Sequence, residues 1–186
     1  MINKWNFQTP SEEELHKRDQ LVAELGFSPV ICLLLVQRGI TSIEEAKKFF
    51  KPSLNDLHDP FLMPDMDKAV RRLNKALGNK EKILIYGDYD VDGTTAVSLV
   101  FKYLRPYSST LDFYIPDRYD EGYGISYKGI DYAAENGVSL VISLDCGIKA
   151  IEKIEYAKEK GIDFIICDHH MPDTTLPDAV AVLDAK

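Results

Sequence analysis

The sequence lacks a long apolar segment, and this pattern excludes a membrane-spanning helix. Its longest uninterrupted apolar run covers residues 30–36, whereas a helix that crosses a bilayer needs about 20 apolar residues. The first residues also lack the apolar stretch of a secretion signal. We therefore expect a cytoplasmic protein that does not act at a membrane.

Cysteine is scarce as well. The 3 cysteines are Cys32, Cys146 and Cys167, and no two of them have CxxC spacing. An odd number without that spacing indicates neither a disulfide framework nor a structural zinc site. We expect the three thiols to be small buried residues.

Positive charge is the third shortage, because the formal net charge is −8. Proteins that bind nucleic acid through its phosphates usually present a basic surface. Two interpretations stay open. Either a cluster of metal-binding carboxylates raises the acidic count, or the basic surface lies on a part of the protein outside this sequence.

What is present is enough for a folded protein, with 45% apolar and 28% charged residues. Residues 1–79 form a predicted helical N-terminal region. Helices are expected after Ser11, over residues 29–38, after Ser42 and over residues 65–77. Ser11 with Glu14, and Thr41–Ser42 with Glu44–Glu45, have the spacing of capping boxes.

Residues 80–186 alternate apolar strands with helices. The predicted strands cover residues 82–86, 111–115, 139–144, 162–166 and 179–183, and the predicted helices cover 94–104, 126–136 and 148–160. Strands that are apolar on both faces are typical of a parallel sheet covered by helices. The fold class is therefore predicted to be α/β, with a parallel sheet flanked by helices.

Acidic and imidazole side chains follow several of these strands. They are Asp88, Asp90 and Asp92 after the first strand, Asp145 after the third, and Asp168, His169 and His170 after the fourth. The carboxyl ends of parallel strands meet at one edge of a sheet. So many negative charges repel each other unless cations separate them. Carboxylate and imidazole without thiolate favour Mn²⁺ or Mg²⁺.

The local geometry of the cluster can also be predicted. If the segment is extended, Asp88, Asp90 and Asp92 share one face because they are two residues apart. Gly93 then allows a turn, and the helix from Thr94 directs its N-terminus at a substrate phosphate. His169 and His170 are expected to point in opposite directions, so that one binds metal and the other faces substrate. Asp145 has an alternative role as a helix N-cap.

The implied reaction is hydrolysis of a phosphoester assisted by two metal ions. The histidine that is not a ligand would bind the phosphate or protonate the leaving group. Arg118 would bind a phosphate through two hydrogen bonds. The alternative for Arg118 is a surface salt bridge with one of its acidic neighbours, Asp117, Asp120 or Glu121.

These motifs together carry a resemblance to a known family. Asp168-His-His170 after a strand, Asp88-Tyr-Asp-Val-Asp92-Gly upstream and Asp145 between them resemble the DHH phosphoesterase superfamily. Further segments, 115–118, 121–124, 143–147 and 60–67, resemble its RecJ family of exonucleases specific for single-stranded DNA.

The resemblance implies an α/β fold, Mn²⁺ or Mg²⁺ as cofactor, and release of mononucleotides from the 5′ end of single-stranded DNA. It also implies partners in DNA repair and recombination. The implied metal ligands are Asp88, Asp90, Asp92, Asp145 and His169. Catalysis is assigned to His169, His170 and Asp90, and substrate binding to Arg118, His170, Gly93 and Thr94.

The sequence departs from this family in one respect. The family has a further metal-binding aspartate downstream and then a domain that grips the substrate, and nothing after His170 fills either role. The chain is therefore expected to be an N-terminal fragment that binds metal weakly and has little activity. Alternatives are a cyclic-dinucleotide or short-oligonucleotide phosphodiesterase, a non-catalytic replication scaffold, and a haloacid-dehalogenase-like phosphatase with Asp90 as nucleophile and Asp92 as acid–base residue.

Overall fold

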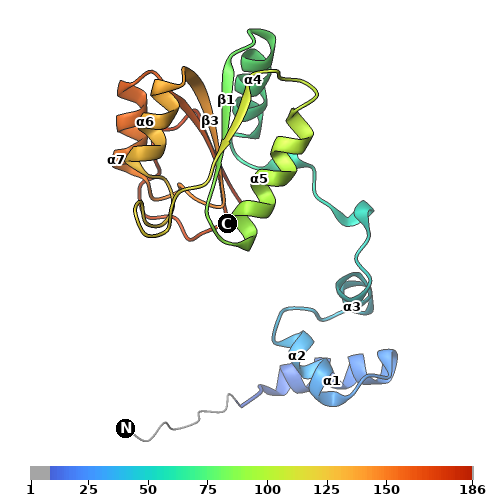
Figure 1. Cartoon of the computed structure of the whole chain (residues 1–186). Coiled ribbons are helices and arrows are strands. Elements are labelled where there is room, and N and C mark those ends of the chain that lie inside the picture. Colours follow the sequence, from blue (N-terminus) through green and yellow to red (C-terminus); the bar gives the residue numbers. More distant parts are fainter. Residues whose placement is uncertain (1–8, 186) are drawn as a thin grey trace, which may run out of the picture. The chain divides into compact units, whose positions relative to one another are not determined.

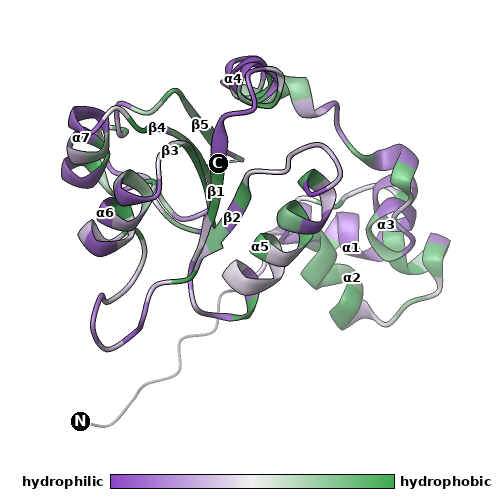
Figure 2. Ribbon diagram, turned by 45° about the horizontal axis from the view of Figure 1, so that its top comes forward, coloured by the Kyte–Doolittle hydropathy of each residue, from purple (hydrophilic) through white to green (hydrophobic). Residues whose placement is uncertain are grey.

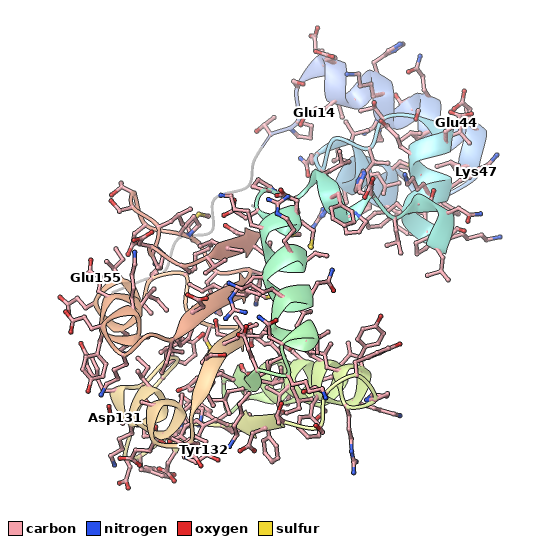
Figure 3. The ribbon with its side chains drawn as sticks, turned by 90° about the horizontal axis from the view of Figure 1, so that it is seen from above. Glu14, Glu44, Lys47, Asp131, Tyr132 and Glu155 are labelled. Carbon is pink, nitrogen blue, oxygen red and sulfur yellow. The ribbon has the colours of Figure 1, made fainter. Side chains whose placement is uncertain are left out.

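The computed structural model describes residues 9–185 and divides into two units, one ending at His58 and one beginning at Asp59. The N-terminal unit contains α1 (Glu12–Leu25), α2 (Pro29–Val36), α3 (Ile43–Phe50) and the short helix η1 (Leu54–Asp56). Figure 3 shows Glu44 and Lys47 on the exposed side of α3. Among residues 9–185, no helix has both the length and the apolar character needed to cross a bilayer.

The predicted helix starts in this unit are confirmed. Ser11 and Glu14 form a complete capping box at α1, and Ser42 and Glu45 form another at α3. Each box satisfies backbone N–H groups that the first turn of a helix leaves without partners. The helices enclose a small core, which consists of Leu21, Cys32, Leu35, Val36 and Ala46.

The second unit is built on five parallel strands in the order β2-β1-β3-β4-β5. They are β1 (Lys82–Gly87), β2 (Leu111–Tyr114), β3 (Val138–Leu144), β4 (Asp163–Asp168) and β5 (Ala181–Asp184). The helices are η2 (Pro60–Leu62), α4 (Met66–Gly78), α5 (Val91–Leu104), α6 (Tyr127–Glu135) and α7 (Ile151–Glu159). The predicted α/β class with a parallel sheet is confirmed.

Helices cover both faces of the sheet, as Figure 1 shows. Alternate residues of β1 enter two separate cores: Leu84 and Tyr86 pack with α6 and α7, while Ile83 and Ile85 pack with α4 and α5. This two-sided burial explains why the strands are mainly green in Figure 2 and why they are continuous apolar runs in the sequence. Helix α4 contributes Ala69 and Ala76 to this unit. The predicted boundary at residues 79/80 stays a prediction.

The strand order places a topological switch point beside β1. The chain passes from β1 through α5 to β2 on one side, and then through α6 to β3 on the other side. In open α/β sheets, ligands bind outside the carboxyl ends of the strands at such a point. The strand ends of β1, β3 and β4 are neighbours there, and they carry Asp88, Asp145 and Asp168.

Candidate metal centre

Asp88 follows β1 directly and is almost completely buried, with 1% of its surface exposed. Its Oδ1 accepts only a long hydrogen bond of 3.5 Å from the Gly124 N–H, and its Oδ2 has no hydrogen-bond partner. A buried carboxylate oxygen without a partner costs free energy. A cation beside Asp88 would remove that cost.

Asp145, which follows β3, and two histidines, which follow β4, lie close together. One ligand atom each from Asp145, His169 and His170 lies within 4.8 Å of the others. His169 Nε2 is 2.9 Å from Asp145 Oδ1. Two adjacent ligands of an octahedral ion with bonds of ~2.1 Å lie about 3 Å apart. The donor atoms and their spacing therefore fit a hard divalent ion such as Mn²⁺ or Mg²⁺.

The electrostatics of Asp145 also fit a cation. Burial raises the pKa of Asp145 above its usual value, and the negative charge of Asp90 raises it further, against the opposing effect of His169. Among residues 9–185, no lysine or arginine forms a salt bridge with Asp88, Asp90, Asp92, Asp145 or Asp168. The negative charge of Asp145 is therefore destabilised by its position and has no permanent positive partner.

Asp168 ends β4 and organises the histidine pair. Its Oδ1 accepts from His170 Nδ1 at 2.7 Å and from the His169 and His170 backbone N–H groups, while Oδ2 accepts from the Ile148 N–H at 3.0 Å. Burial raises the pKa of Asp168, but these hydrogen bonds outweigh it and leave the pKa below its usual value. Asp168 is therefore an ionised group that positions His170.

His170 has a partner at each ring nitrogen. A carboxylate can only accept, so the contact with Asp168 places a proton on Nδ1, and in the neutral imidazole Nε2 is then an acceptor. The Tyr123 hydroxyl lies 3.1 Å from Nε2 and donates to it in that tautomer. Burial, and then the charges of nearby aspartates including Asp88 and Asp145, raise the pKa of Tyr123 to about 12. Tyr123 therefore keeps the proton that it donates.

Two geometric predictions for this cluster are wrong. Asp88, Asp90 and Asp92 do not share one face of an extended segment, because α5 begins at Val91, three residues earlier than predicted. Asp90 is the N-cap of α5 and Asp92 lies in its first turn. His169 and His170 do not point in opposite directions, since their ring centroids are 4.7 Å apart.

Gly93 is explained by close packing rather than by a turn. A Cβ at Gly93 would lie 2.5 Å from the Asp88 carbonyl oxygen, so only glycine lets α5 approach the site. The Gly93 N–H donates to Asp90 Oδ1, and the Thr94 N–H donates to the Asp90 carbonyl oxygen. Contact of Gly93 and Thr94 with a substrate phosphate would require these bonds to be exchanged, so it stays a prediction.

The alternatives for Asp145 and Arg118 are also wrong. The N-cap of α7 is Ala150, and Asp145 does not cap this helix. Arg118 forms no salt bridge with any described residue; its guanidinium lies 5.2 Å from the centre of the Tyr89 ring. Glu121 is instead bonded to Tyr114 and Ser126. Arg118 is exposed, so its charge stays accessible to a phosphate.

Sequence reasoning missed Tyr123, although it stands in the segment 121–124 that carries part of the resemblance. Its partner His170 is 47 residues away, and only the fold brings them together. Tyr89 was missed for a similar reason: its ring contacts Tyr123 edge-on at 6.3 Å and lies under Arg118. These residues form an aromatic side of the site.

Residues 82–186 match the family model described as the DHH family, N-terminal domain. The chain belongs to this family. It is 40% identical over 183 residues to the single-stranded-DNA-specific exonuclease RecJ of Bacillus subtilis, and 33% identical over 173 residues to that of Escherichia coli. These alignments cover 98% and 92% of this chain but 23% and 29% of the relatives. The chain therefore spans about a quarter of their length.

Two solved structures are similar as well. An exonuclease RecJ bound to manganese matches with a TM-score of 0.62 and 28% identity over 69% of this chain and 33% of its own. RecJ from Thermus thermophilus in complex with Mn²⁺ matches with a TM-score of 0.67 and 25% identity, over 91% of this chain and 23% of its own. The family and fold predicted from the motifs are confirmed.

Proposed function

We propose that this chain forms the metal-binding part of a phosphoester hydrolase that degrades single-stranded DNA. The observation that carries the proposal is the unpartnered, buried Oδ2 of Asp88 after β1, together with the cluster of Asp145, His169 and His170 after the neighbouring strands β3 and β4. The RecJ relatives support DNA as the substrate. The similarity to RecJ structures that contain manganese supports Mn²⁺ as the metal. Mg²⁺ fits the same ligands.

The residues divide into ligands and substrate-binding groups. Asp88, Asp90, Asp92, Asp145 and His169 would hold the metal, as two ions in the complete enzyme. When bound, such ions lower the pKa of a coordinated water and stabilise negative charge on the phosphate.

The protein groups around this centre have separate tasks. Asp168 and Tyr123 fix the His170 ring, so that its Nε2 edge can exchange the tyrosine hydroxyl for a substrate group. His170, with His169 and Asp90, is the catalytic set of the proposal. Arg118 would bind a backbone phosphate bidentately, since it is exposed and held over Tyr89.

Several further parts of the proposal rest on the family resemblance. They are 5′-to-3′ polarity and action in DNA repair and recombination with protein partners of those pathways. We also propose a cytoplasmic location, because the sequence contains no apolar run long enough to span a bilayer. Residues 80–186 are assigned to the N-terminal part of the DHH domain, preceded by the helical region 1–79. The complete site is expected to need a downstream aspartate and a second domain.

Metal binding and cleavage should be measured separately on this chain. Calorimetric titration with Mn²⁺ should show weak binding that Asp145→Asn removes. A 5′-labelled single-stranded oligonucleotide should be cleaved slowly, with mononucleotides as products. Absence of Mn²⁺ binding by the unmodified chain would refute the proposal. A strong preference for dinucleotides over longer strands would favour a short-oligonucleotide phosphodiesterase.

A further inference from the structure

Two cavities border the candidate metal centre, and Asp168 lines both of them. The first, of about 490 Å³, opens beside His170 and is lined by residues that include Tyr123, Ile148, Lys149, Lys153 and Met171. The second, of about 470 Å³, lies beside His169, and its lining includes Met63, Asp92 and Asp145. We call them the lysine cavity and the acidic cavity.

The two cavities differ in charge. The lysine cavity has two cations, Lys149 and Lys153, and one carboxylate, Asp168, which already accepts hydrogen bonds from Ile148 and His170. The lining of the acidic cavity contains three aspartates and no lysine or arginine. Asp92 and Asp145 of the acidic cavity are proposed metal ligands, so bound cations would offset their charge. Beyond the metal centre itself, the lysine cavity is therefore the one of the two whose lysines can attract a phosphate chain.

The cations of the lysine cavity are available to a ligand. Lys153 forms no salt bridge with any residue of the described range 9–185. Lys149 lies 3.4 Å from Asp173, and both side chains are more than half exposed. An exposed pair of this kind contributes little free energy, so Lys149 can exchange Asp173 for a phosphate.

The walls of the lysine cavity suit a nucleobase. Tyr123 offers an aromatic ring, Ile148 an apolar floor, and Met171 an apolar side chain that is 66% exposed. Bases stack on aromatic rings in proteins that bind single strands without sequence preference. The volume also lies within the range of about 300–1,000 Å³ that is usual for small-molecule sites.

We propose that the lysine cavity binds a nucleotide of the single-stranded substrate next to the phosphate that is cleaved. The base lies against Tyr123 and Met171, and Lys149 and Lys153 hold a backbone phosphate. This proposal rests on the proposed function, because its ligand is the substrate of that reaction. It adds the direction in which the strand leaves the metal centre, toward Lys149 and Lys153 at the start of α7.

Titration with thymidine 5′-monophosphate, followed by the amide NMR signals of the ¹⁵N-labelled chain with Mg²⁺ present, tests the proposal. The largest shifts are expected at residues of the lysine cavity. Lys149→Gln with Lys153→Gln should weaken binding about tenfold, which corresponds to about 1.4 kcal/mol. The matched control is Lys158→Gln with Lys160→Gln, because it removes the same charge at the other end of α7, and it should leave the affinity within about twofold.

A second pair of variants tests the apolar wall. Met171→Ala should weaken nucleotide binding about threefold, whereas Met63→Ala, which truncates the same side chain in the acidic cavity, should have no effect. Thymidine, which lacks the phosphate, should bind more weakly than its monophosphate and should be insensitive to the lysine substitutions.

Calorimetry with Mn²⁺ on the same samples separates this proposal from the proposed function. Mn²⁺ binding without nucleotide shifts in the lysine cavity would overturn the cavity proposal alone. Unchanged nucleotide affinity in the Lys149/Lys153 variant, or shifts centred on Met63 and Asp92, would also overturn it. Nucleotide binding in this cavity without any Mn²⁺ binding would support the cavity and refute the metal-dependent hydrolase.

Discussion

The amino ends and the carboxyl ends of the strands form two opposite edges of the sheet. The acidic side chains at these two edges have different partners. At the amino edge, Glu81 precedes β1 and Asp163 begins β4, and both are bridged by Arg72 of α4, at 2.7 and 2.6 Å. At the carboxyl edge, Asp88 and Asp145 have no lysine or arginine partner among the described residues. Arg72 supplies a positive charge to both acids at the amino edge, and no lysine or arginine among the described residues does so for Asp88 or Asp145.

The difference shows which carboxylates serve the fold. Arg72 is nearly buried, with 10% of its side chain exposed, and it also reaches the carbonyl oxygen of Ser139 at the start of β3. It therefore ties α4 to three strands. Asp88 is more deeply buried than either acid at the amino edge but lacks such a tie, so a cation from outside the chain would stabilise its carboxylate.

The largest expected effect is the loss of metal binding when the carboxyl edge loses a charge. Asp145→Asn removes a proposed anionic ligand that His169 also contacts, so Mn²⁺ affinity should fall by at least about a hundredfold, beyond the usual cost of losing an outer-shell partner. Calorimetric titration measures it. Asp163→Asn, the same change at the amino edge, should leave Mn²⁺ affinity unchanged. Equal Mn²⁺ affinities in the two variants would mean that the two edges of the sheet do not differ in metal binding.

For stability, we expect the larger effect at the amino edge. Arg72→Ala leaves the mostly buried Glu81 without its cation and should lower the free energy of unfolding by about 3 kcal/mol, measured by urea denaturation. Arg71→Ala is the control on the same helix. Its exposed pair with Asp67 is worth only about 0.3–0.5 kcal/mol. A similar loss in both variants would mean that the network of Arg72 with Glu81 and Asp163 does not set the effect.

Acid should reduce the advantage that Arg72 provides. Burial raises the pKa of Glu81, but hydrogen bonds from Ser139 and Arg72 outweigh it and leave the pKa below its usual value. A lowered pKa in the folded state means a stabilisation that is present above the unfolded value of about 4.3 and is lost as the pH falls through the folded value. The stability difference between the unmodified chain and Arg72→Ala should therefore shrink below that pH. A constant difference would contradict the assignment to Glu81.

The parallel sheet could be predicted because its strands are apolar on both faces, and β1, β3 and β4 were located within about two residues, the usual uncertainty at such ends. Asp88, Asp145 and the Asp168-His-His170 segment were placed at one edge for the same reason. The sequence also allowed the observed start of α5, since aspartate is one of the residues preferred at an N-cap and Asp90 occupies that position. The regular spacing of the three aspartates instead suggested an extended segment.

The contacts of Tyr123 could not be predicted from sequence. Its position depends on the loop between β2 and α6, in which Glu121 accepts hydrogen bonds from Tyr114, Ser126 and the Asp117 N–H. Tyr114 belongs to β2 and Ser126 caps α6, so these bonds require both elements to be in place. Long-range order of this kind leaves no periodic signal in the sequence.

Asp145→Asn should also change the free energy of unfolding of the metal-free chain, by a smaller amount and in the opposite direction to Arg72→Ala. In the metal-free chain, the Asp145 side chain is mostly buried and is repelled by Asp90, so removing its charge should raise the free energy of unfolding by about 1 kcal/mol. Thermal unfolding without metal measures it. Mn²⁺ should then stabilise the unmodified chain, by mass action, but not the variant. Destabilisation of the metal-free chain by Asp145→Asn would show that the His169 contact matters more to the fold than the repulsion.

The smallest expected effect concerns the aromatic side of the carboxyl edge. Tyr123→Phe keeps the ring but removes the hydroxyl that donates to His170 Nε2, while Asp168 continues to hold the proton on Nδ1. The ¹⁵N chemical shift of Nε2 should therefore change, while that of Nδ1 stays that of a protonated nitrogen. Tyr89→Phe is the matched control, because among described residues its hydroxyl has no hydrogen-bond partner. A shift of both nitrogens in Tyr123→Phe would mean that the tyrosine, rather than Asp168, sets the tautomer of His170.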